Sequence, residues 1–478
     1  MLTTKIRKNK FEIIVISIAF IISIIWSLYN IKNFDNNKIN FKGDWYNQLI
    51  YADIGANFSK ADDFRKKLRN GESFFEALPI YEKYFLPNII VGYYYYIVDK
   101  EIYENKPNDQ RVIKVDNKKF GLLFIQIIFF YISVIFFASQ LKKKIDPLLY
   151  KLIIFFLCLE PSIIQWHSTF WTESVFLSLM VILFSLLINI KDKFFINLFI
   201  GIIVGLMFAQ RSVSFLYILP ILILYFLNFK LNIRPYLFLI IGYSLIILPI
   251  GYNNFKKTGN FHFLSKKHQY YSFYHYFAHV IKADKQKISK QEAKEILLKE
   301  EKSWIKKNEI DIKIFDDYVK NVDYRNKIFM KELLENPFFF VKLYTKKIIT
   351  MSIIHPLWTH EHYYYDKSDP EAYLNPKKYY HKNLYKNIIY SLFLYPFIIV
   401  GVFFFIKKIF MRERITGFDF FLIFNIFSIL YYLFISGLWG NPKYFAPCMI
   451  STIFFFSMGF KKLLFSLKKI KKLKDKLS

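Results

Sequence analysis

Four acidic side chains are expected near the membrane surface, either close to the end of an apolar segment or in the loop that follows one. They are Asp44, Asp53, Glu160 and Glu173. A carboxylate in such a place can take a proton from a hydroxyl group, which would make it a general base for attack by that hydroxyl. For each acid taken alone, the ordinary alternative is a solvated loop residue or a helix N-cap, and Glu173 could simply cap the helix that follows it.

Two cations stand at the same level as these acids. Arg211 follows one apolar run directly, and Lys443 lies between two others, with His167 near the acids. A cation close to the hydrocarbon boundary is costly unless it meets an anion, and a lipid phosphate is the obvious anion at that depth. Arginine can hold a phosphate through two parallel hydrogen bonds. The alternative for both residues is an interfacial cation that extends into water.

A histidine-rich stretch raises the question of a metal site. It contains His355, His360, Glu361 and His362. The two histidines of the HEH sequence lack the i, i+4 spacing that places two ligands on one helix face. The residues therefore indicate no cofactor, and a divalent metal is left open.

The composition indicates a membrane protein. Hydrophobic residues make up 54% of the 478 residues and aromatic residues 21%, and the apolar residues form runs too long for the strands of a soluble core. The formal charge of +30 would suit nucleic acid, but the lysines lie mainly between the apolar runs and in the tail. We therefore expect a lipid bilayer as the partner of this surface and no nucleic acid.

About ten apolar runs could cross the membrane as helices, and they predict an all-α polytopic protein. They lie near residues 11–29, 120–140, 147–160, 174–190, 195–210, 213–228, 235–252, 385–406, 418–437 and 444–460. Basic residues favour the cytoplasmic side, and the short basic loops alternate consistently with this count. The N- and C-termini are therefore predicted to be cytoplasmic, in a multi-pass protein of the cytoplasmic (inner) membrane.

The runs divide the chain into three parts. Residues 1–252 form an N-terminal transmembrane module with a first outer loop at 30–119. Residues 253–384 form a second extracytoplasmic region, and residues 385–478 hold the last transmembrane helices and a basic cytoplasmic tail.

Each outer region contains a segment that we expect to lie in the membrane interface. Residues 84–98 are apolar and aromatic but are broken by proline and glycine, and residues 337–358 carry a polar stripe at helical spacing. Ser289 and Glu292 predict a capping box before a charged helix near 290–308. Gly201 and Gly205 predict close helix packing on the fifth span.

The order of these features resembles the GT-C glycosyltransferase superfamily, in particular the bacterial branch similar to protein O-mannosyltransferases and lipid A aminoarabinose transferases. Six stretches carry the resemblance in the family order, across most of the chain. They are GDWYNQLIYA with ALPIYEKYFLPNIIVG, EPSIIQWHSTFWTESVFLSL, GIIVGLMFAQRSVSFLYILPILIL, GYNNFKKTGNFHFLS, ENPFFFVKLYTKK and NPKYFAP.

The resemblance implies transfer of a sugar from a polyprenyl-phosphate donor to a hydroxyl of a glycan, lipid or protein on the extracytoplasmic face, with inversion at the anomeric carbon. Asp44 then matches the catalytic base. The remaining matched residues would contact the substrates or support the site, with Arg211 and Lys443 on the donor phosphate; they are Arg211, Lys443, Tyr444, Glu173, His167 and Asn254.

The chain departs from the family pattern at three places. Lys443 stands where the family usually has arginine, and Asn253 where an arginine commonly precedes the asparagine matched by Asn254. The first loop has one acid, Asp44, where many relatives have an adjacent pair, so Asp53 remains an alternative base.

Two other classes of function use a similar membrane scaffold. A lipid-linked oligosaccharide flippase or other transporter would need ionisable residues near mid-membrane, and no internal repeat is evident. An O-antigen polymerase or ligase also uses lipid-linked sugars outside the cell, but its ordinary layout would not explain an acid-bearing first loop.

Overall fold

The computed structural model describes residues 10–36, 55–80, 85–105, 111–113, 118–168, 172–259, 261–263, 274–312, 315–353, 376–411, 415–437 and 446–477. Almost all of these residues are helical, as the sequence predicts. The exceptions to the helical structure in these ranges include two three-residue strands, β1 (Tyr103–Asn105) and β2 (Arg111–Ile113), which pair antiparallel.

The part of the chain that the structure describes contains eight helical segments long and apolar enough to cross a membrane. Because a bilayer needs about 20 apolar residues, this confirms the prediction of a polytopic α-helical membrane protein. The eight segments are Lys10–Tyr29, Phe120–Leu141, Pro147–His167, Ser212–Phe229, Ile233–Thr258, Ile388–Phe410, Gly417–Ile435 and Pro447–Leu467. Two further apolar runs of the sequence form shorter helices, Glu173–Leu187 and Phe194–Gln210.

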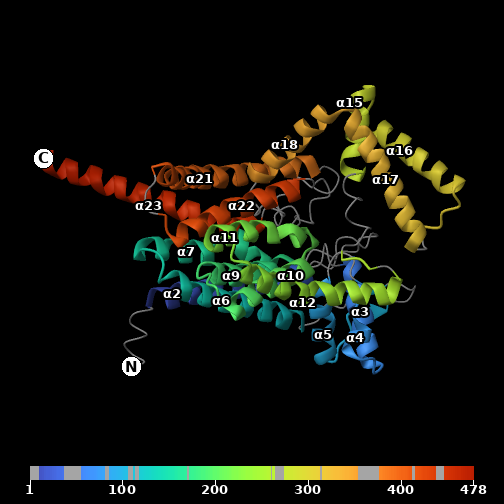
Figure 1. Ribbon diagram of the computed structural model, residues 1–478, viewed down its shortest axis with the longest axis horizontal. Coiled ribbons are helices and arrows are strands. Elements are labelled where there is room, and N and C mark those ends of the chain that lie inside the picture. The colour runs from blue at the N-terminus through green and yellow to red at the C-terminus, as the bar shows by residue number, and fades with distance from the viewer. Residues whose placement is uncertain are drawn as a thin grey trace.

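These helices form one bundle around a shared apolar core (Figure 1). Its elements are α2 (Lys10–Asn36), α6 (Lys118–Leu141), α7 (Pro147–Leu159), α8 (Pro161–Ile164), α9 (Thr172–Leu187), α10 (Phe194–Gln210), α11 (Ile218–Phe229), α12 (Ile233–Thr258), α21 (Pro376–Phe410), α22 (Gly417–Gly437) and α23 (Ala446–Leu477). The first residues of α2 and the last residues of α23 lie toward the same end of the bundle (Figure 1).

Glycines allow two pairs of helices to approach closely. A Cβ atom on Gly201 would lie 2.1 Å from the carbonyl oxygen of Leu239, and one on Gly242 would lie 2.1 Å from that of Leu198. The prediction of close packing at Gly201 is therefore confirmed for α10 and α12. A glycine also allows α21 to approach α23 closely, because a Cβ on Gly401 would lie 1.9 Å from the Phe455 carbonyl oxygen.

The segment predicted to be the first outer loop contains α3 (Gly55–Arg69), α4 (Phe74–Ala77) and α5 (Phe85–Ile97). They gather at the bundle end opposite the start of α2 (Figure 1), which we call the site end. The predicted helix at 84–98 exists as α5, and it is packed on α3, because Val91 and Tyr95 are buried and a Cβ on Gly92 would meet the Ala61 carbonyl oxygen at 2.5 Å.

The described helices of the segment predicted to be the second outer region project from the bundle as an α-helical hairpin (Figure 1). A π-helical turn (Tyr274–Ala278) leads into α15 (His279–Gln286), α16 (Lys290–Lys307), α17 (Phe315–Glu335) and α18 (Pro337–Ile353). The Ser289 side chain caps α16 by accepting from the backbone nitrogen of Glu292 at 3.1 Å, which is the serine half of the predicted capping box. The polar stripe expected at 337–358 falls on α18 as far as that helix is described.

Candidate functional site

The break between α7 and α8 places one of the predicted acids inside the protein. Pro161 cannot continue α7 and instead opens α8, for which Glu160 is the N-cap. The Glu160 carboxylate accepts hydrogen bonds from the Ser162 hydroxyl at 2.9 Å and from the Tyr390 hydroxyl of α21 at 2.9 Å. This acid is therefore buried and hydrogen-bonded, and it connects two distant parts of the chain.

His167 follows in the 3₁₀ turn Gln165–Ser168 and is completely buried. Its ring lies 4.6 Å from the ring of Phe130, and its Nδ1 lies 3.5 Å from the hydroxyl of Ser174. Since Ser174 directly follows Glu173, the histidine packs beside the first turn of α9. The structure thus brings His167 close to the next predicted acid.

Glu173 and Arg211 form a buried ion pair. Glu173 lies in the first turn of α9, and Arg211 is the residue at which α10 ends. Glu173 Oε1 and Arg211 Nη1 are 3.2 Å apart, and the two side chains are only 2% and 5% exposed. The guanidinium also lies 5.6 Å from the ring of Phe176. Glu173 therefore supplies Arg211 with an anion from within the protein, and low exposure makes their mutual attraction strong.

The segment after Arg211 is fastened to α22 by hydroxyl groups. Tyr431 donates to the Val213 carbonyl at 2.6 Å, the Tyr217 and Ser428 hydroxyls are 2.6 Å apart, and the Ser214 and Tyr432 hydroxyls are 3.3 Å apart. These contacts hold the 3₁₀ turn Ser212–Tyr217 against the bundle. The anchored turn therefore restrains the backbone next to Arg211, and Glu173 restrains the Arg211 side chain.

A second apolar core joins the same region to α3, α4 and α5. Phe208 and Ala209, in the last turn of α10, belong to one buried cluster with Phe64, Leu78 and Phe85. The first outer loop thus packs directly on the helix end that carries Arg211. Helices α3, α4 and α5 therefore meet the end of α10 at the site end.

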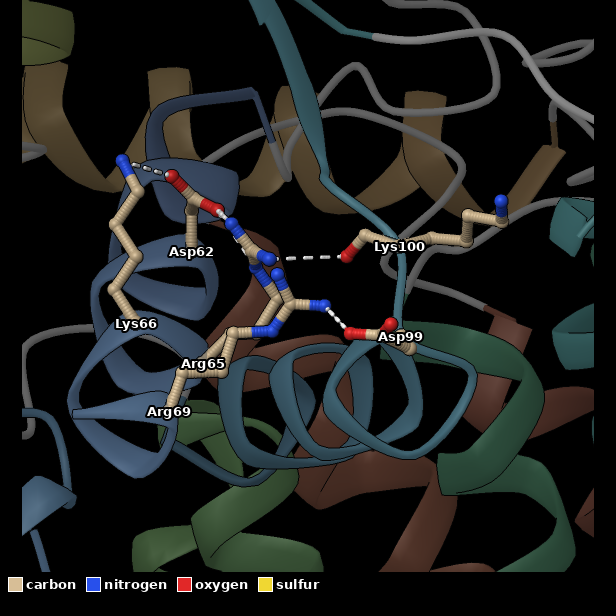
Figure 2. Close-up of polar contacts among 6 residues, drawn as sticks. All are labelled: Asp62, Arg65, Lys66, Arg69, Asp99 and Lys100. Atoms are coloured by element: carbon tan, nitrogen blue, oxygen red, sulfur yellow. Dashed lines mark hydrogen bonds and ion pairs between the residues drawn. The ribbon is translucent and has the colours of Figure 1, made fainter. Parts of the chain in front are cut away.

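Within the first outer loop, charged residues fix α3 against the end of α5 (Figure 2). Arg65 donates to Asp62 at 2.8 and 3.0 Å and to the Lys100 carbonyl at 3.1 Å. Lys66 pairs with Asp62 at 2.8 Å, and Arg69 pairs with the carboxylate of Asp99. Sequence reasoning missed this cluster, although the i, i+3 spacing of an acid and an arginine was available as a signal.

Two asparagines near the end of α12 donate hydrogen bonds to neighbouring segments. The side-chain amide of Asn254 donates to the His262 carbonyl at 2.8 Å, and that of Asn253 donates to the Pro79 carbonyl at 2.9 Å. Both side chains are buried. Asn254, predicted to contact substrate, thus supports the turn that follows α12, while Asn253 joins α12 to the first outer loop.

The other predicted residues, Asp44, Asp53, Lys443 and Tyr444, lie outside the residues that the structure describes, as does the histidine-rich stretch. In the described ranges, histidine, cysteine, aspartate and glutamate form no group of three or more that could hold a metal ion. No protein-family model matches the chain, and no curated protein matches it significantly.

Proposed function

We propose that the protein is a membrane glycosyltransferase that uses a polyprenyl-phosphate sugar and resembles the GT-C class. In this proposal the ten apolar helices all cross the inner membrane, the termini are cytoplasmic, and the site end faces outward. The observation that supports the proposal is the buried Glu173–Arg211 pair, which follows the turn of α10 that packs on α3, α4 and α5.

The proposed chemistry needs a base and a binding place for phosphate. Asp44, or alternatively Asp53, takes the proton of the acceptor hydroxyl, which attacks the anomeric carbon as the bond from that carbon to the phosphate oxygen breaks. Asp53 stands two positions before the first residue of α3. Arg211 and Lys443 bind the departing lipid phosphate, and Glu173 fixes the orientation of the Arg211 guanidinium.

The distribution of charge favours an enzyme over a transporter. Apart from Glu160, acids of the described apolar helices lie near the helix ends, as with Glu173 in the first turn of α9 and Asp419 in the first turn of α22. Glu160 is the most internal acid, and it is engaged by Ser162 and Tyr390. A flippase that moves a charged headgroup through the bundle would need ionisable groups along the path.

The proposal is tested by the donor dependence of sugar transfer. Purified protein in lipid nanodiscs is given radiolabelled polyprenyl-phosphate sugars, and Arg211→Lys is compared with wild type. Because lysine keeps the charge but lacks the planar fork, we expect a higher KM for the donor with a smaller change in kcat.

Arg234→Gln is the matched control, since Arg234 lies exposed at the beginning of α12, at its end away from Asn254. An unchanged donor KM in Arg211→Lys would refute the phosphate role of Arg211. Absence of transfer by wild-type protein with every donor would refute the enzyme.

A further inference from the structure

A basic cavity lies at the junction of α3, α4 and α12, apart from the Glu173–Arg211 pair. It has a volume of about 240 Å³, several times what one water molecule needs. Its charged lining consists of Lys60, Lys67 and Lys257 against the single acid Asp63. Glu72, which pairs with Lys67 at 3.7 Å, is a second acid beside this lining. Three ammonium groups against two carboxylates still leave a net positive charge, which favours an anion in the cavity.

Lys257 is held in place at the cavity wall. Its ammonium donates to the carbonyl of Glu76 at 3.2 Å and also to the carbonyl of Leu78. An ammonium has three donors, so these two carbonyls leave one for a ligand. The backbone thus orients this cation before any ligand arrives, which lowers the entropic cost of binding.

The position of the cavity indicates where its ligand comes from. Lys257 lies in the last turn of α12, at the end of a candidate membrane span, the depth at which lipid headgroups lie. Large apolar side chains of the same helices are exposed: Phe75 of α4 is 76% exposed, and Tyr252 and Phe255 are exposed near the end of α12. Aromatic rings beside lysines at a span end are typical of the membrane interface.

We propose that this cavity binds the phosphate of an anionic membrane phospholipid, with the headgroup among the three lysines and the acyl chains along α12. The bound lipid joins α12 to α3 and α4, and so stabilises the first outer loop on the bundle. This inference does not depend on the proposed glycosyltransferase activity.

Binding is measured on the full-length, delipidated protein in detergent micelles, titrated with radiolabelled phosphatidylglycerol or phosphatidylcholine. Two lysines near a membrane surface contribute about 30-fold to affinity for an anionic lipid. We therefore expect Lys60→Gln/Lys67→Gln to weaken phosphatidylglycerol binding by about that factor.

The control Lys294→Gln/Lys302→Gln removes the same charge from exposed positions outside the cavity, and it should bind phosphatidylglycerol as wild type does. Lys60→Arg/Lys67→Arg should also retain binding. Equal binding by wild type and Lys60→Gln/Lys67→Gln, or equal loss in the control, would overturn the proposal.

Two further measurements identify the ligand and guard against a misfolded variant. Inorganic phosphate at millimolar concentration should not displace the lipid; displacement would mean that the cavity binds a free anion. Phosphatidylglycerol with a photoreactive headgroup should cross-link wild-type protein within residues 60–80 or 252–258. Cross-links confined to other segments would overturn the assignment without any variant.

Discussion

Glu173 and Arg211 should depend strongly on each other for stability. The perturbation is a set of three variants: Glu173→Gln, Arg211→Gln and the double variant. Each single change leaves one charge behind at a position that is at most 5% exposed. Because an unpaired buried charge costs about 3–5 kcal/mol, each single variant should lose about that much free energy of unfolding.

The double variant carries no unpaired charge, so its loss should be smaller than the sum of the two single losses. Residues in direct contact typically couple by up to about 3 kcal/mol, and the 3.2 Å separation at low exposure places this pair near the upper end, at about 2–3 kcal/mol. The coupling energy, and not either single loss, reports the interaction itself.

The free energy of unfolding is measured by titrating protein in mixed micelles with sodium dodecyl sulfate while following tryptophan fluorescence. Lys67 and Glu72 supply the control cycle, because they are 3.7 Å apart but 42% and 40% exposed. That pair should couple by less than about 1 kcal/mol. A coupling energy for Glu173 and Arg211 no larger than the control would refute the buried pair.

Three further predictions concern packing, titration and the first outer loop. Gly242→Ala places a Cβ 2.1 Å from the Leu198 carbonyl and should lower the melting temperature, at a cost of about 1–3 kcal/mol. Burial of the Lys347 ammonium lowers its pKa from 10.5 to about 8, so its acetylation rate should rise through a midpoint near that pH. Between pH 8 and 10.5 the folded state therefore binds fewer protons at Lys347 than the unfolded state does, so the free energy of unfolding should increase with pH over this range. Arg65→Gln removes the guanidinium from Asp62, which then keeps its ion pair with Lys66. This change should increase the rate of proteolysis within α3.

Each of these has a matched comparison. Gly417→Ala meets open space, so an equal loss in that variant would contradict the packing argument for α10 and α12. Lys347→Met should remove the rise in stability between pH 8 and 10.5, and a variant that keeps it would assign the rise to another group. Lys100→Gln keeps the backbone carbonyl that Arg65 uses, and proteolysis equal to that of Arg65→Gln would contradict the role of the guanidinium.

The membrane architecture could be predicted from the sequence because bilayer thickness sets the length of apolar runs. Features that depend on a few neighbouring residues could also be predicted. The Ser289 cap of α16 and the glycine contact at Gly201 follow from rules that act over a few residues. The helix at 84–98 was predicted for the same reason, but its packing on α3 was not, since that depends on a contact between separate helices.

The site could be predicted only in part. Sequence reasoning offered a lipid phosphate or the aqueous interface for Arg211 and did not predict its contact with Glu173, which stands on another helix. Asp62 and Arg65 look like an ordinary solvated helix face until α5 and the Lys100 carbonyl cover them. Whether a charged side chain is buried depends on contacts between separate helices, and the hydrophobic periodicity of the sequence does not predict these contacts.

Sugar transfer by the purified protein tests the central claim most directly. Wild-type protein in nanodiscs is incubated with a panel of radiolabelled polyprenyl-phosphate hexoses and pentoses, with cell-envelope membranes as the source of acceptor. Asp44→Asn and Asp53→Asn are compared with Glu72→Gln, which removes a carboxylate from the exposed side chain that pairs with Lys67. We predict transfer by wild type and Glu72→Gln, and loss of transfer in Asp44→Asn or, if Asp53 is the base, in Asp53→Asn. Full activity in both aspartate variants, or no transfer by wild type from any donor, would contradict the account.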